Sequence, residues 1–127
     1  MNTILNEALL STKHIQHAAI IKSKDGQVKA KSPFLSISLL DFEKISKAFV
    51  NPKEARAENG FVFSNTSYKA VRADTYSIYA KNNENCGVIV AKTANHYIIG
   101  TYDSTMFCSV AAEAVEKLAD YFRKKNK

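Results

Sequence analysis

With 127 residues, the chain can bury about two thirds of its unfolded surface, which is enough for one compact domain over residues 1–127 without disulfide or metal staples. Its 18 Lys and Arg residues against 12 Asp and Glu residues give a formal net charge of +6, which favours nucleic acid, acidic lipid headgroups or an acidic protein surface without choosing among them. Cys86 and Cys108 form no CxxC pair, so free thiols are expected. The sequence shows neither a signal peptide nor the roughly 18-residue apolar run of a membrane span, so a cytoplasmic protein is expected.

The first half of the chain is expected to contain two helices separated by a β-hairpin. Apolar residues at helical spacing between residues 4 and 9 predict a short first helix. The runs AAIIKS and QVKAK flank Asp25-Gly26, a hairpin signal because glycine supplies a positive φ without a Cβ clash. Ser38 stands three residues before Asp41 as a weak capping box, and the apolar stripe that follows predicts a second helix ending before Pro52.

The second half is expected to form most of the sheet and a closing helix. A brief helical turn from Lys53 to Ala57 precedes four or five antiparallel strands, which run from Phe61 to Tyr102. The last helix is expected to start near Phe107, and its buried face comprises Ala111, Ala114, Val115, Leu118 and Phe122. This order of helices and strands predicts the α+β class.

The run from Tyr68 to Lys81, YKAVRADTYSIYAK, is interpreted as a binding surface. Two strand-like segments are broken at Asp74, whose side chain can accept hydrogen bonds from its own downstream backbone and start a turn. Because side chains alternate across a strand, Tyr79 and Lys81 share one face and Ile78 points to the other.

A family resemblance rests on the joint order of several blocks. The segments VRAD and SIYAK, then GVIVAKT and IIGTY, then EKLADYFRK follow one another with spacings similar to those of the profilins, and the hairpin AAIIKSKDGQVKA extends the likeness toward the amino end. Missing aromatics near the amino terminus and the basic end RKKNK most resemble the divergent, testis-type fourth profilin group. The resemblance implies a profilin-like fold, in which the N- and C-terminal helices cover one face of a central antiparallel sheet and smaller helices cover the other. It also implies a monomeric, non-enzymatic, cytoskeleton-associated protein that needs no cofactor.

Profilins bind actin monomers through the later strands and the last helix, so the resemblance implies an actin site. The matching positions are Arg72, Tyr79, Lys81, Lys92 and Thr93. Cations around a tyrosine combine charge steering with an amphipathic anchor. Where several family members carry a basic residue on the last helix, this chain has Glu113, followed by Glu116, and a reversed charge at a desolvated contact costs several kcal/mol. A weakened actin affinity is therefore expected, although a solvated helix surface is the alternative interpretation of each acid.

The second profilin surface binds proline-rich peptides through aromatic side chains, and most of these aromatic residues are replaced in this chain. The family places a Trp and a Tyr in the first helix and a Trp in the second strand, and this chain has Thr3, Asn6 and Lys29 there. Only Tyr121 remains of the aromatic set. Buried aromatic anchors contribute about 2 kcal/mol or more each to such interfaces, so little or no polyproline binding is expected.

Acidic phospholipids are the alternative partner, because profilins also bind phosphoinositides. Candidate cations lie near the amino-terminal hairpin and in the tail, and they are Lys13, Lys22, Lys24, Arg123, Lys124, Lys125 and Lys127. Each cation close to an anionic leaflet contributes about 1 kcal/mol. The alternative function is thus binding of phosphoinositide or phosphatidic acid with no significant actin binding, unless these cations serve only solubility.

Enzyme and nucleic-acid functions find little support in the sequence. His14 and His17 are three residues apart, but His96 stands alone in a strand and no HExxH or CxxC motif completes a metal site. No His or acid is placed to activate Cys108, and the four glycines form no phosphate loop. The aromatic-rich RNP pattern of RNA binders is absent and acids are mixed among the cations, so a nucleic-acid partner is not expected.

Overall fold

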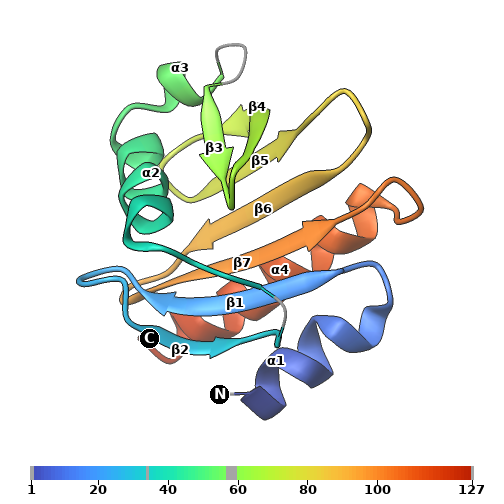
Figure 1. Ribbon diagram of the computed structural model, residues 1–127. Coiled ribbons are helices and arrows are strands. Elements are labelled where there is room, and N and C mark those ends of the chain that lie inside the picture. Colours follow the sequence, from blue (N-terminus) through green and yellow to red (C-terminus); the bar gives the residue numbers. More distant parts are fainter. Residues whose placement is uncertain (1, 34, 57–59, 127) are drawn as a thin grey trace.

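The computed structural model describes residues 2–33, 35–56 and 60–126. It has the expected α+β class, with a curled antiparallel sheet and helices on both of its faces (Figure 1). The elements in chain order are α1 (Asn2–Ala8), the 3₁₀ helix η1 (Leu10–Thr12), β1 (His17–Lys22), β2 (Val28–Lys31), α2 (Leu39–Val50), α3 (Pro52–Ala55), β3 (Phe61–Phe63), β4 (Thr66–Ala73), β5 (Ser77–Lys81), β6 (Gly87–Lys92), β7 (His96–Tyr102) and α4 (Cys108–Lys124).

The sheet has seven strands in the order β2-β1-β7-β6-β5-β4-β3, and each neighbouring pair is antiparallel. Pairing of β1 with β7, from His17 opposite Thr101 to Lys22 opposite His96, joins the amino-terminal hairpin to the later meander. Two register shifts interrupt the ladders, one between β1 and β2 and one between β4 and β5. The second shift lies in the segment that the sequence marks as a binding surface.

The helices form two layers with the sheet between them, as the resemblance implies. On one face, α1 and α4 cover a cluster centred on Leu5, Ile20, Val115 and Phe122, and in Figure 1 α4 lies behind the strands. On the other face, α2 packs on a second cluster that includes Phe61 and the β5 and β6 side chains facing it. The expected buried stripe of α4 is confirmed except at Ala114, which is half-buried, and Ala119 joins it.

The second helix begins with a complete capping box. Asp41 N donates to Ser38 Oγ at 3.1 Å, and Ser38 N donates to Asp41 Oδ2 at 3.0 Å. The other oxygen of Asp41 accepts from Ser64 N at 2.9 Å, so this carboxylate, 7 % exposed, ties α2 to the β3–β4 turn. Of the helical turn expected from residue 53 to residue 57, α3 supplies the part up to Ala55, and Ala57 lies outside the described residues.

The first hairpin turns at Gly26, which has a φ of +79°, as the Asp-Gly signal predicts. The ring of Phe42 lies against this turn, because a Cβ at Gly26 would come within 2.7 Å of Phe42 Cγ. No helix among the described residues is long and apolar enough to span a bilayer.

Candidate functional site

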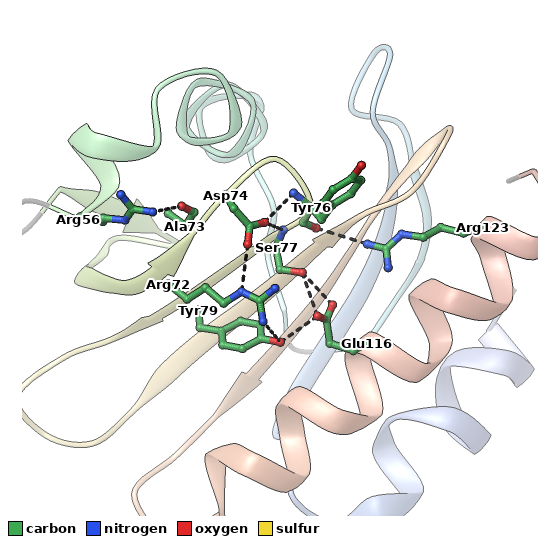
Figure 2. A network of polar contacts seen from close by, with 9 residues as sticks. All are labelled: Arg56, Arg72, Ala73, Asp74, Tyr76, Ser77, Tyr79, Glu116 and Arg123. Carbon is green, nitrogen blue, oxygen red and sulfur yellow. Dashed lines mark hydrogen bonds and ion pairs between the residues drawn. The ribbon is translucent and has the colours of Figure 1, made fainter.

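A polar network joins β4, the β4–β5 turn, β5 and α4 (Figure 2). At its outer end, the guanidinium carbon of Arg72 stacks 5.0 Å from the centroid of the Tyr79 ring. Arg72 Nε donates to Asp74 Oδ2 at 3.1 Å, and its Nη1 lies 3.5 Å from the Tyr79 hydroxyl. The side chain of Arg72 is thereby held flat over the tyrosine rather than extended into solvent.

Asp74 organises the turn in the way that the sequence predicts. Its Oδ1 accepts from the backbone N–H groups of Tyr76 at 2.8 Å and Ser77 at 2.9 Å. Partial burial alone would raise the pKa of Asp74, but these two hydrogen bonds and the bond from Arg72 outweigh it and hold the pKa below its ordinary value. The carboxylate therefore stays charged and fixes Arg72.

Glu116 closes the network from the α4 side. Its oxygens accept from Ser77 Oγ at 2.9 and 3.0 Å, and its Oε2 also accepts from the Tyr79 hydroxyl at 2.9 Å. Burial raises the pKa of Tyr79 to about 12, helped by the hydrogen bond and charge of Glu116 and opposed by Arg72. The tyrosine thus remains a neutral donor at physiological pH.

A bulge at Val71 brings Arg72 and Tyr79 together. Ala70 lies opposite Ala80 and Arg72 lies opposite Tyr79, so one extra residue stands in β4 at this point. Without it, strict alternation would place Arg72 on the α2 side of the sheet together with Ala70. The bulge moves the guanidinium to the α4 side, where Tyr79 packs.

Lys81 shares the α4 side with Tyr79, as the strand alternation predicts, because Ile78 and Ala80 belong to the α2-side cluster. It is exposed, lies opposite Lys69 in the ladder, and makes no ion pair with any residue in the described ranges. We call Arg72, Tyr79 and Lys81 the β4–β5 patch.

Lys92 and Thr93 do not join this patch. Lys92 follows Val88 and Val90 on the α2 side, and its Nζ lies 6.0 Å from the ring centroid of Phe49. Thr93 is 5 % exposed, and its hydroxyl is held in the β6–β7 turn, accepting from His96 N at 3.1 Å. The five positions that the resemblance implies for the actin site therefore do not form one surface, because Lys92 lies across the sheet and Thr93 lies inside a turn.

Arg123 is a structural tie rather than part of a free basic tail. Its Nη2 and Nε donate to the carbonyl oxygen of Lys92 at 2.8 and 3.2 Å, and its Nη1 pairs with Asp120 at 2.9 Å. The guanidinium also stacks 5.7 Å from the exposed ring of Tyr76. These carbonyl contacts could not be predicted from the sequence, because they join residues 31 positions apart and depend on where the end of β6 meets α4.

Between α1 and α4 lies an apolar groove of about 620 Å³. It is lined by Ile4, Glu7, Ala8, Thr12, Val110, Glu113, Ala114, Lys117, Leu118 and Tyr121. Of the four positions assigned to the proline-peptide surface, only Tyr121 lines the groove, and Thr3, Asn6 and Lys29 are exposed outside its lining. Five of these lining residues are aliphatic and four are polar or charged, and Tyr121 supplies the one aromatic face among them.

The segments that carry the basic residues of the first hairpin and of the tail are both hydrogen-bonded to the β6–β7 turn. Ser23 N donates to the carbonyl of Asn95 at 3.0 Å, and Asn95 Nδ2 donates to the carbonyl of Asn126 at 3.0 Å. These bonds bring Lys22 and Lys24 to the same end of the molecule as Lys124 and Lys125. Lys13 lies just before β1, at the opposite end of that strand, so it does not belong to this cluster.

No metal site is assembled in the part of the chain that the structure describes. No three His, Cys, Asp or Glu side chains gather there to hold a metal ion. Cys86 and Cys108 are both free thiols.

Comparisons with known proteins agree on one family. The family model described as Profilin matches residues 1–127. Profilin-4 of Bos taurus is 44% identical over 126 residues, covering 98% of this chain and 96% of its own, and Profilin-4 of Mus musculus is 43% identical with the same coverage. The crystal structure of Acanthamoeba castellanii profilin II superposes with a TM-score of 0.90 at 34% identity, covering 99% of this chain and 98% of that one. The likeness to the fourth profilin group is therefore confirmed.

Proposed function

Because this chain belongs to the profilin family, whose members are actin-binding regulators of the cytoskeleton and not enzymes, we propose that it binds monomeric actin weakly through the β4–β5 patch. The observation that carries this proposal is the bulge at Val71, which places Arg72 on the same face as Tyr79 and Lys81. A stacked guanidinium and tyrosine with an exposed lysine beside them form a compact amphipathic surface, of the kind enriched among interface anchors. The proposed place of action is the cytoplasm, at the actin cytoskeleton.

A weak affinity follows from the charges inside the patch. Arg72, Lys81 and Lys69, which lies opposite Lys81 on the same face, contribute three positive charges, and the neighbouring Asp74 and Glu116 contribute two negative charges, so 3 − 2 leaves the surface close to neutral. Charge complementarity mainly sets the association rate and specificity, and a neutral patch gives little steering toward an acidic partner. Glu113, exposed on the outer side of α4, adds a further negative charge nearby.

Titration of the protein against monomeric actin at low salt tests this proposal. Saturable binding is expected, with Arg72→Glu and Lys81→Glu each weakening it, because each puts a negative charge on the contact surface. Lys44→Glu is the matched control, since Lys44 is exposed on α2, across the sheet from the patch. Absence of saturable binding below about 100 μM, well short of ordinary interface affinities, rejects the proposal.

Proline-rich peptides bind to profilins, and we propose that this chain has largely lost that activity. The groove between α1 and α4 presents Tyr121 as its single aromatic lining residue among those described. A polyproline II ligand offers ring faces and carbonyls but no donors, so it needs several aromatic faces and nearby donors to bind well.

An acidic membrane surface is the second candidate partner. It is favoured by the meeting of the hairpin lysines with the tail lysines around Asn95. Lys22, Lys24, Lys124 and Lys125 at about 1 kcal/mol each would give reversible association that weakens as salt rises.

Cosedimentation with vesicles of phosphatidylcholine, with and without phosphatidic acid or phosphoinositide, tests the membrane proposal. More protein is expected on the acidic vesicles, and Lys124→Glu/Lys125→Glu is expected to remove most of the excess. Lys13→Glu serves as the control because Lys13 lies at the other end of β1. Equal binding to acidic and neutral vesicles would exclude this function.

A further inference from the structure

Two acids lie one turn apart on α4, and the structure gives them different environments. Glu113 is exposed at the rim of the groove between α1 and α4 and forms no ion pair with a described residue. Glu116 is half-buried and points to β5, where both of its carboxylate oxygens accept hydrogen bonds. Glu116 contacts the β4–β5 patch through the Tyr79 hydroxyl (Figure 2).

The hydroxyl groups that bind Glu116 depend on it. Ser77 is 1 % exposed, and within the described part of the chain both acceptors of its Oγ are the Glu116 oxygens. A buried hydroxyl without an acceptor is costly, and hydrogen bonds to an ionised acceptor are stronger than neutral ones. Loss of this carboxylate would therefore release Ser77 and Tyr79 together.

Release of Tyr79 would reach the outer part of the patch. Arg72 stacks on the Tyr79 ring, and its Nη1 approaches the same hydroxyl that donates to Glu116. A continuous chain of contacts therefore runs from Glu116 to Tyr79 and Arg72. It ends at Asp74, and it holds the four side chains in one arrangement. A surface ordered before binding avoids the entropy cost of ordering mobile side chains in the complex.

We propose that Glu116 is the positioning residue of the β4–β5 patch, and that its carboxylate strengthens actin binding by holding Tyr79 and Arg72 in place. This inference rests on the proposed function, and it reverses the expectation that both acids of α4 oppose binding. Glu113 does not share this role, because it lies at the rim of the groove between α1 and α4 and makes no hydrogen bond to the patch among the described residues.

Actin titrations of Glu116→Gln and Glu113→Gln separate the two roles. Glu116→Gln keeps the size of the side chain but loses the charge-assisted bonds, and it is expected to weaken binding by about tenfold. Glu113→Gln is expected to leave binding unchanged or to strengthen it. Equal or tighter binding by Glu116→Gln overturns the proposal, because removal of a repulsive charge alone gives that result.

Tyr79→Phe is the second variant, and circular dichroism and thermal unfolding confirm that each variant is folded. Tyr79→Phe keeps the ring under Arg72 but removes the hydroxyl, so it is expected to weaken binding as Glu116→Gln does. In the double variant the two effects are expected not to add, since residues that act as a unit are coupled. Full additivity would overturn the proposed unit.

An alkaline titration of tyrosinate absorbance tests the arrangement without actin. The titration step that is lost in Tyr79→Phe belongs to Tyr79. This step is expected to move to lower pH in Glu116→Gln, because the hydrogen bond to Glu116 and the negative charge of Glu116 both disfavour the tyrosinate. If the parent does not bind actin, the proposed function fails while this titration still decides the positioning role. An unmoved step overturns it.

Discussion

Rebuilding the aromatic cradle is predicted to restore proline-peptide binding to this chain. The perturbation is the triple variant Thr3→Trp, Asn6→Tyr and Lys29→Trp, which returns to three positions the residue types that the profilin resemblance implies there. All three positions are exposed, so the substitutions enter no core and fold stability is expected to stay within about 0.5 kcal/mol of the parent. Tyr121, 45 % exposed, supplies the remaining aromatic face.

The size of the effect follows from the number of anchors regained. A well-placed aromatic anchor contributes about 2 kcal/mol, so two productive anchors of the three give about 4 kcal/mol, or roughly a thousandfold in Kd. The parent is expected to bind a polyproline peptide more weakly than about 1 mM, and the triple variant to bind in the low micromolar range.

Calorimetric or fluorescence titration with a proline decamer measures both constants. Lys44→Trp is the matched control, since it adds an exposed indole on α2, across the sheet from α1 and α4. A folded triple variant that still binds no better than the parent refutes the reasoning, because the missing aromatics would then not be the cause. Micromolar binding by the parent would refute the proposed loss itself.

Three further predictions concern stability and are measured by urea unfolding. Asp41→Ala is expected to lower the free energy of unfolding by about 2–4 kcal/mol, because it removes a helix cap and the buried hydrogen bond from Ser64 N to the carboxylate. Ser38→Ala removes only the cap and is expected to lower it by about 1 kcal/mol. Equal losses for the two variants would contradict a stabilising role of the Ser64 bond. Gly87→Ala is expected to lower it by about 1–3 kcal/mol, since the new Cβ would meet the Tyr102 ring and a backbone oxygen, and an unchanged midpoint would refute that packing. Asp74 has a folded pKa below its ordinary value near 3.8, so its stabilisation is present above that value and is lost as pH falls through the folded pKa. The parent is therefore expected to lose more stability than Asp74→Asn between about pH 5 and about pH 2, and an equal loss would contradict the assignment.

The fold followed closely from local signals in the sequence. The Asp25-Gly26 turn, the capping box before α2 and the aspartate turn at Asp74 all form as predicted, because each depends on residues within a few positions of one another. The two-layer arrangement followed from the profilin resemblance, and the burial pattern of α4 agrees with its apolar spacing.

The candidate site was predictable only in part, because its geometry depends on register and on long-range contacts. Alternation along β5 correctly placed Tyr79 and Lys81, but no pattern in VRAD marks the bulge that brings Arg72 to their side. Lys92 was expected beside Tyr79 and Lys81, but it lies on the opposite face. It comes two positions after Val90 and four after Val88, and both valines face α2. Which face Val88 and Val90 share with the β5 residues depends on the β5–β6 pairing, which the spacing along β6 does not give.

Glu116 shows a different limit of the sequence. A helix surface acid looks the same in sequence whether it faces solvent or a strand, and here residue 116 meets hydroxyls that lie 39 and 37 positions away. The spacing of apolar residues in α4 places Glu116 beside the buried stripe of the helix. Its partners, Ser77 and Tyr79, are known only once the packing of α4 on β5 is known.

Hydrogen–deuterium exchange with and without monomeric actin tests the central claim most directly, since it shows where actin lies on the molecule. The β4–β5 patch as the docking surface predicts slower exchange in peptides covering Thr66–Ala73 and Ser77–Lys81, with little change in Leu39–Val50 on the other layer. Slower exchange confined to Leu39–Val50, or no change anywhere at saturating actin, would contradict it.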